Sequence, residues 1–167
     1  MRDPIGITGW PKEKGRDGER TPMQWDDSNA QAGFSTNSRT WLPVTTNYRT
    51  VNVQNESADP ESLLSWHRKL IALRRSSAAL RAGRTVMLDR ANGQVLTYAR
   101  VAQDGETIVV ALNLSAQPQT ILLELGASGV RGSRLNTLLA SPAPLPATAA
   151  DRPLTLAPFA AWVAAVN

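Results

Sequence analysis

The feature that most constrains the fold is a change in the period of the apolar residues near residue 84. From there onward, apolar and polar residues alternate in short runs separated by turn-forming residues, which is typical of β-strands. Asn92-Gly93 is a strong hairpin signal between the runs 84–89 and 94–101. The later runs are 107–114, 120–125, 134–139, 154–157 and 160–166. This spacing predicts a mainly β fold with an antiparallel β-sandwich over 77–167.

The run from Thr107 to Leu114 is apolar almost throughout. A strand with one solvated face alternates between apolar and polar residues, so a continuous apolar run indicates burial on both faces. We therefore expect this strand to lie in the centre of the sheet. The stretch from Ser141 to Pro153 is rich in Ala and Pro, which predicts an exposed loop.

A helix is predicted over 59–76, ahead of the strands. Asp59 is a suitable N-cap, and Pro60 would occupy the first helical position, where a missing N–H is tolerated. Apolar residues recur at three- and four-residue spacing, which indicates one apolar stripe along the helix. The stripe comprises Leu63, Trp66, Leu70 and Ile71. We expect it to face a partner surface that this chain mostly lacks, which would leave several of these side chains without an inner contact.

The Gly and Pro residues of 1–58 leave little room for a helix, and the segment has too many aromatic residues for a flexible linker. The aromatic residues are Trp10, Trp25, Phe34, Trp41 and Tyr48. A loop of this length usually has a function or belongs to a larger structure. We expect a long irregular segment in which Trp10 and Trp41 are packing residues.

The charges of this segment are concentrated in one stretch, Gly15-Arg16-Asp17-Gly18-Glu19-Arg20-Thr21-Pro22-Met23-Gln24-Trp25-Asp26. Pro22 prevents a helix through its middle and favours extended backbone at the preceding residue. Loops that carry charged and aromatic residues on a rigid scaffold usually contact a ligand or another surface. This stretch is therefore the main candidate for a functional site.

The same stretch, followed by Ala32-Gly33-Phe34-Ser35, resembles the α-glucosidase, oligo-1,6-glucosidase and trehalose-synthase branch of the α-amylase superfamily (glycoside hydrolase family 13). In that family the segment lies in the loop after the eighth strand of a (β/α)8 barrel. The last barrel helix and an antiparallel Greek-key β-sandwich, called domain C, come next. The resemblance therefore implies an active-site loop segment over 1–58, the last barrel helix over 59–76 and domain C over 77–167.

The resemblance also implies roles for single residues. Arg20 matches an arginine that holds the terminal glucose in members that cut from the non-reducing end, and a guanidinium offers a planar fork of donors for that task. The alternative for Arg20 is an ion pair with Asp17 or Asp26 that stiffens the loop. We expect Arg16, Asp17, Trp25 and Asp26 to brace the loop, with stacking on a sugar ring as the alternative for Trp25.

No catalytic residue is predicted in this chain. Retaining glycoside hydrolysis needs two carboxylates about 5 Å apart, and the family takes its catalytic carboxylates from barrel strands to which no position here corresponds. His67, the single histidine, falls within the predicted helix and is interpreted as a packed or surface residue. We expect the chain alone to be inactive.

Two function classes remain open. The first is the C-terminal portion of an α-glucosidase-type enzyme, whose parent hydrolyses or transglucosylates short α-glucosides and whose barrel is a missing partner of this chain. The second is a non-catalytic carbohydrate-binding or structural β-sandwich. A free-standing sandwich has no reason to carry an active-site loop and a barrel helix, so the stretch 15–26 favours the first class.

Composition excludes several other classes. The chain has no cysteine and one histidine, so we expect no metal site and no cofactor. Its 18 basic residues are scattered among 14 acidic ones, unlike the clustered basic faces of nucleic-acid-binding proteins. No apolar run approaches the length of a membrane span and no signal peptide opens the sequence. We therefore expect a cytoplasmic protein without nucleic-acid or membrane partners.

Overall fold

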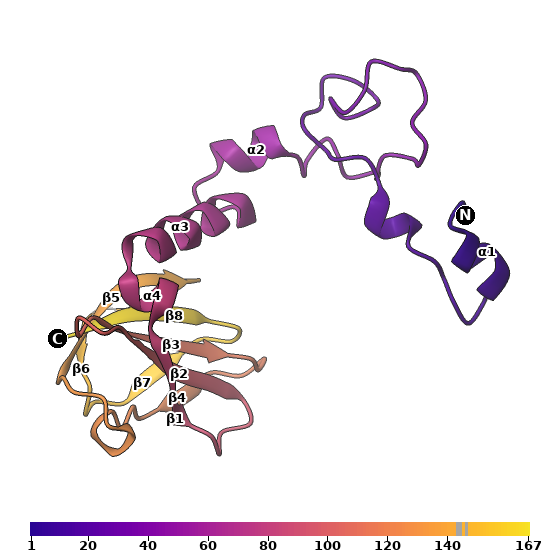
Figure 1. The fold of residues 1–167 in the computed structure, drawn as a ribbon. Coiled ribbons are helices and arrows are strands. Elements are labelled where there is room, and N and C mark those ends of the chain that lie inside the picture. Colours follow the sequence, from indigo (N-terminus) through magenta and orange to yellow (C-terminus); the bar gives the residue numbers. More distant parts are fainter. Residues whose placement is uncertain (143–144, 146) are drawn as a thin grey trace. The chain divides into compact units, whose positions relative to one another are not determined.

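The computed structural model describes residues 1–142, 145 and 147–167 and contains two compact units, Met1–Arg68 and Lys69–Asn167. The strands among the described residues all belong to the C-terminal unit, whereas the N-terminal unit consists of short helices and loops (Figure 1). Helix α3 (Leu63–Ser76) runs through the boundary between the two units. Each unit is described separately below.

The N-terminal unit contains α1 (Pro4–Gly9), the 3-10 helix η1 (Asp17–Arg20) and α2 (Val53–Ala58). Short helices therefore occur within a segment that the sequence predicts to be mostly irregular. Local caps explain the difference, since the side chain of Asp3 accepts a hydrogen bond from the N–H of Ile5 and that of Asn52 accepts one from the N–H of Asn55. Six-residue helices with such caps escape detection by apolar periodicity.

The predicted start of the long helix is also wrong. Asp59 is the C-cap of α2, because its N–H donates to the carbonyl of Asn55, and α3 begins only at Leu63. Ser62 takes the place expected for Asp59, since its Oγ accepts a hydrogen bond from the N–H of Ser65 at 3.1 Å. Glu56 adds a second acceptor for this end of α3, with Oε2 3.0 Å from the N of Leu64.

The apolar stripe of α3 is only partly covered. Leu63 and Ile71 are exposed, as expected of a stripe whose partner surface lies mostly outside this chain, whereas Trp66 and Leu70 are half-buried. Near the end of α3, Leu73 packs against the apolar cluster of the C-terminal unit described below. The helix therefore presents apolar side chains that no described part of the chain covers.

The C-terminal unit is an antiparallel β structure preceded by α4 (Ala78–Ala82). Its strands are β1 (Arg84–Asp89), β2 (Val95–Val101), β3 (Thr107–Asn113), β4 (Gln119–Ile121), β5 (Arg134–Ser141), β6 (Thr148–Ala149), β7 (Leu154–Leu156) and β8 (Ala161–Val166). Six strands form one sheet in the order β1-β2-β3-β8-β5-β6, and β4 pairs with β7 in a second sheet. A short 3-10 helix, η2 (Gly126–Ser128), follows β4.

The mainly β, antiparallel fold confirms the predicted fold class, while Greek-key connectivity stays a prediction. The hairpin at Asn92-Gly93 joins β1 and β2 as expected, and β3 lies between β2 and β8 with nearly every side chain buried. Two details differ from the sequence prediction. The run 120–125 yields only the three-residue β4, and β6 lies within the stretch predicted as a loop, of which residues 143, 144 and 146 lie outside the described residues.

Two apolar clusters lie on opposite faces of the six-stranded sheet. The larger fills the space between this sheet and the β4–β7 pair, with Trp162 and Leu156 fully buried. The smaller lies on the outer face, over which α4 runs (Figure 1). There Ala79 packs with Ile108, Val110 and Val163. The described residues contain no helix long and apolar enough to cross a membrane.

Thr97 provides a test of the larger cluster. Its side chain is buried, and its Oγ1 has no hydrogen-bond partner in the described residues. A buried hydroxyl without a partner destabilises the folded state, and valine has nearly the same shape. We therefore expect Thr97→Val to raise the free energy of unfolding by about 1 kcal/mol, as measured by urea denaturation of the 167-residue chain.

Thr97→Ser is the matched control for this prediction. It keeps the unpaired hydroxyl and removes a buried methyl group, so it should lower the free energy of unfolding. A loss of stability in Thr97→Val would show that the hydroxyl has a partner, such as a bound water.

Candidate functional site

The first half of the candidate stretch depends on one glycine. Gly15 has φ +70°, and a Cβ placed there would lie only 3.0 Å from Cα of Gly6 and 3.1 Å from Cβ of Asp3. Any larger residue would therefore crowd α1 and strain the backbone at this position. Gly18 has no neighbour within 4 Å of a built Cβ, so close packing does not require glycine at that position.

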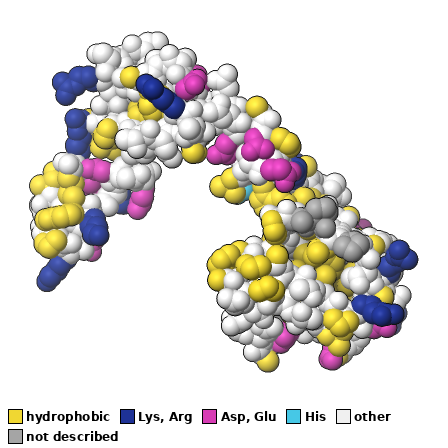
Figure 2. Space-filling model, turned by 180° about the vertical axis from the view of Figure 1, so that it is seen from behind, with side chains coloured by type: hydrophobic (Ala, Val, Ile, Leu, Met, Phe, Trp, Pro, Cys, Tyr) yellow, Lys and Arg dark blue, Asp and Glu magenta, His cyan; other side chains and the backbone are white. Residues whose placement is uncertain are grey.

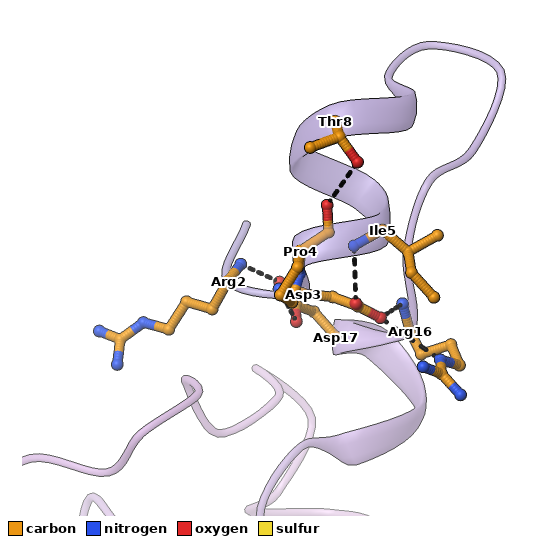
Figure 3. A network of polar contacts seen from close by, with 7 residues as sticks. All are labelled: Arg2, Asp3, Pro4, Ile5, Thr8, Arg16 and Asp17. Carbon is orange, nitrogen blue, oxygen red and sulfur yellow. Dashed lines mark hydrogen bonds and ion pairs between the residues drawn. The ribbon is translucent and has the colours of Figure 1, made fainter.

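Two carboxylates join this stretch to the start of the chain (Figure 3). Asp3 caps α1 and also accepts from Arg16, whose backbone N lies 2.8 Å and whose Nε lies 3.4 Å from Asp3 Oδ2. Asp17 in turn accepts from the backbone N–H groups of Arg2 and Asp3. Three charged side chains, at positions 3, 16 and 17, thus fix the backbone of two segments.

The environment of Asp3 favours its ionised form. The residue is 5% exposed, and hydrogen bonds from the backbone N–H groups of Arg16 and Ile5 lower the pKa of its carboxyl below the usual 3.8. The guanidinium of Arg16 acts in the same direction, while desolvation opposes the shift.

The lowered pKa of Asp3 predicts an acid-sensitive network. A carboxyl whose pKa is lower in the folded state stabilises it fully above the unfolded-state pKa, and this contribution disappears as the pH falls below 3.8 and through the folded-state pKa. We expect the amide resonances of Ile5 and Arg16 to move together over that range in an NMR titration. Asp3→Asn should abolish the shared transition, and an unchanged transition in this variant would contradict the assignment.

Arg20 is the last residue of η1 and is exposed. Its side chain makes no hydrogen bond or ion pair with any described residue, and the next residue, Thr21, has extended backbone. The carboxylates of Asp17 and Asp26 accept hydrogen bonds from other groups. The geometry therefore leaves the guanidinium available for an external partner.

Backbone hydrogen bonds hold the segment after Arg20 on one side. The carbonyl groups of Gln24 and Trp25 accept from the N–H groups of Val53 and Gln54, both at 3.0 Å. These donors belong to the first turn of α2, where N–H groups have no partner within the helix. The N-terminal end of α2 therefore fixes the position of this segment.

A compact turn holds the segment on the other side. The N–H groups of Trp25 and Asp26 both donate to the carbonyl of Ala32, at 2.9 and 3.3 Å. The side chain of Asp26 accepts from the hydroxyl and the N–H of Ser28, and these bonds lower the pKa of its carboxyl. A Cβ at Gly33, which has φ +67°, would collide with the Asp26 carboxylate. The indole of Trp25 itself is 50% exposed.

Gln24 is a structural residue that the sequence analysis missed. Its Oε1 accepts from the hydroxyl of Thr45, and its Nε2 donates to Oδ1 of Asn47 and to the carbonyl of Val51. One side chain thus connects the candidate stretch to a segment more than twenty residues away. A glutamine between Met23 and Trp25 gives no local signal of such contacts.

A cavity of about 280 Å³ lies beside this segment in the N-terminal unit. It is lined by Thr21, Pro22, Met23, Gln24, Val51, Asn52, Val53, Glu56 and Leu64. Its lining is mostly aliphatic, with a carboxylate and two carboxamides among the polar groups. Among the described residues, no group of three or more His, Cys, Asp or Glu side chains could hold a metal ion.

The prediction that Trp10 and Trp41 are packing residues is wrong for this chain, since both are exposed. The guanidinium of Arg2 lies over the ring of Trp41, 4.9 Å from its centroid. Figure 2 shows hydrophobic side chains at the surface of this unit. The aromatic residues lack the surfaces that would cover them, because little of the unit forms an apolar core. His67 is exposed, which agrees with its interpretation as a packed or surface residue.

Two family models match the chain in succession. The model described as alpha amylase, catalytic domain, matches residues 2–83, and the one described as maltogenic amylase, C-terminal domain, matches residues 86–163. The change from one to the other falls where α4 is followed by β1. The loop, α3 and α4 are therefore similar to part of a catalytic domain, and the β-sandwich is similar to the domain that follows it.

Curated relatives agree with this division. A glucan 1,6-alpha-glucosidase of Streptococcus pneumoniae is 42% identical over 110 residues, which are 66% of this chain and 20% of that protein. An oligo-1,6-glucosidase of Bacillus cereus is 36% identical over 104 residues, 62% of this chain and 18% of that protein. The chain spans about a fifth of the length of these relatives.

Solved structures show the same similarity in three dimensions. The trehalulose synthase MutB of Pseudomonas mesoacidophila MX-45 matches 92% of this chain and 26% of its own, with a TM-score of 0.78 and 36% identity. A mutant of MutB in complex with the substrate sucrose matches equally well. The fold and the matches together define a protein of the α-amylase superfamily. Within it, the chain belongs to glycoside hydrolase family 13 and resembles the C-terminal part of its α-glucosidases and oligo-1,6-glucosidases.

Proposed function

We propose that this chain supplies the glucose-binding loop and the C-terminal domain of an α-glucosidase-type enzyme, which hydrolyses or transglucosylates short α-glucosides. The single observation that carries the proposal is the position of Arg20. Its guanidinium is exposed and unpaired, while the backbone on both sides of it is fixed by polar contacts. A fixed donor of this kind suits the hydroxyl groups of a sugar.

The other residues of the stretch have supporting roles in this proposal. Arg16 and Asp17 hold the stretch against α1, and Asp26 shapes the turn that ends it. Trp25 is held through its backbone, and we assign it a bracing role as well. None of these groups is proposed as a catalytic residue, because the carboxylates of Asp17 and Asp26 already accept hydrogen bonds within the loop.

The proposal includes the parts of the enzyme that this chain would complete. Residues 1–58 would form an active-site loop segment, 59–76 the last helix of a (β/α)8 barrel and 77–167 domain C. The match of residues 2–83 to a catalytic-domain model supports this division over a free-standing sugar-binding sandwich. The partner of the chain is then the rest of the barrel, which contributes the two catalytic carboxylates. We place the enzyme in the cytoplasm, in keeping with a sequence that contains no cysteine.

A chimera allows the role of Arg20 to be measured. The chimera joins, ahead of this chain, the part of P. mesoacidophila trehalulose synthase that precedes its match to this chain. We expect Arg20→Ala in the chimera to cost about 1.5–3 kcal/mol of sugar binding, the range for a charge-assisted hydrogen bond. This corresponds to a roughly 10- to 100-fold lower kcat/KM for an aryl α-glucoside, with an unchanged Tm.

Arg39→Ala is the matched control, because Arg39 is also an exposed arginine of the N-terminal unit whose side chain bonds to no described residue. It should leave both kcat/KM and Tm unchanged. A lowered Tm with unchanged kinetics in Arg20→Ala would instead show that Arg20 stiffens the loop.

A further inference from the structure

The loop between β1 and β2 contains the one Asn-Gly pair of the sequence, Asn92-Gly93. β1 ends at Asp89 and β2 begins at Val95, so the pair lies at the tip of this hairpin. Gly93 is exposed, and a Cβ built on it would have no heavy atom within 4 Å. Its backbone N–H donates to no described residue. The nitrogen that follows Asn92 is therefore neither crowded nor occupied.

The carboxamide of Asn92 is held at its oxygen. The backbone N–H groups of Gln94 and Val95 both donate to Oδ1 of Asn92, each at 2.9 Å. Asp89 fixes the same residue through its backbone, because its Oδ1 accepts from the N–H of Asn92 at 3.3 Å. The Asn92 side chain is thus folded back over the peptide group that it shares with Gly93.

These contacts indicate a reaction of the chain with itself. We propose that Asn92 is a site of spontaneous deamidation in the folded protein, with the N–H groups of Gln94 and Val95 acting as an oxyanion hole. A hydroxide ion removes the proton of the Gly93 N–H, and the nitrogen attacks Cγ of Asn92. Negative charge then develops on Oδ1, where both N–H groups already point. Donors fixed in this way stabilise such charge without reorganisation.

The reaction needs only water as a co-reactant. The new bond between Gly93 N and Asn92 Cγ replaces the bond between Cγ and Nδ2, and Nδ2 takes up protons from water and leaves as ammonia. Water then hydrolyses the succinimide ring at either of its carbonyl groups, which gives aspartate or isoaspartate at position 92. No oxidation or reduction takes place. Isoaspartate adds one carbon atom to the backbone of the loop and so loosens the hairpin.

Two other asparagines show what sets Asn92 apart. Oδ1 of Asn29 also accepts from two backbone N–H groups, those of Gln31 at 2.7 Å and Gly33 at 3.4 Å. The next residue, however, is Ala30, whose Cβ hinders closure of the ring, whereas glycine has none. Asn113 is 2% exposed and its Nδ2 donates to three carbonyl groups, so loss of ammonia would break all three bonds.

The proposal is tested by peptide mapping with mass spectrometry of the 167-residue chain, incubated at mildly alkaline pH where circular dichroism shows it to be folded. We expect Asn92 to become a mixture of aspartate and isoaspartate before any other asparagine, at a rate that rises with the hydroxide concentration. Absence of this conversion in the folded chain would overturn the proposal, as would conversion that requires unfolding.

Gln94→Pro separates the oxyanion hole from the Asn-Gly pair. Proline has no N–H, so this variant removes one donor and keeps Asn92 and Gly93. We expect deamidation to slow by about tenfold or more, since the loss of one such donor costs at least this much in enzymes. Gln94→Ala is the control, because it keeps the N–H and removes only the side-chain contact with Gln119. It should react at the original rate.

The unfolded chain provides the reference for this pair of variants. In urea, where the oxyanion hole is absent, Gln94→Pro and Gln94→Ala should react at the same rate. Equal rates of the two variants in the folded state would overturn the proposed oxyanion hole.

Ala30→Gly tests the same chemistry as a gain of reactivity in the N-terminal unit. Ala30 is exposed, so the substitution should leave the fold intact. We expect Asn29 to become a second deamidation site, because two N–H groups already donate to its Oδ1. An unreactive Asn29 in this variant would show that two such donors and a glycine are not sufficient, and it would overturn the assignment.

Discussion

The N-terminal unit depends on the carboxylate of Asp3, which is nearly inaccessible to solvent and accepts hydrogen bonds from the backbone of two segments. This contact is typical of the unit, which is held by polar side chains bonded to backbone groups. Among its described residues, Leu42 is the only large aliphatic side chain that is buried. The C-terminal unit is held differently, by two apolar clusters on either side of a sheet. Polar contacts of this kind are directional, so they can fix a loop precisely while providing little of the stability that a core provides.

This difference supports the proposal that the chain positions a binding group, Arg20, while the catalytic carboxylates come from another part of the enzyme. Gln24, Asp26 and the first turn of α2 hold the segment that follows Arg20, and Asp17 holds the segment that precedes it. The N-terminal unit in turn has many exposed aromatic and aliphatic side chains on its surface. A unit of this composition suits a part of a larger domain, in which those side chains find partners, and the family matches agree with that interpretation.

Much of the β structure could be predicted from the sequence, because its signals are local. Asn92-Gly93 specifies a hairpin, and the continuous apolar run of β3 specifies a central strand. The polar network could not be predicted in the same way, since Asp3 and Arg16 are thirteen residues apart and the Gln24 carboxamide bonds to residues 45–51. The start of α3 was misplaced because Asp59 and Ser62 are both good caps, and only the structure shows which helix each one serves. Exposure of Trp10 and Trp41 was missed because sequence pattern does not show whether a partner surface is present.

We propose that this chain contributes substrate binding and a structural domain to a larger enzyme, and no catalytic carboxylate. The most direct test is the turnover of an aryl α-glucoside by the purified 167-residue chain, compared at equal concentration with the chimera that restores the preceding barrel. We expect no turnover above the buffer rate for the chain and measurable turnover for the chimera. Activity of the chain alone that disappears on substitution of Asp17, Glu19 or Asp26 would contradict it.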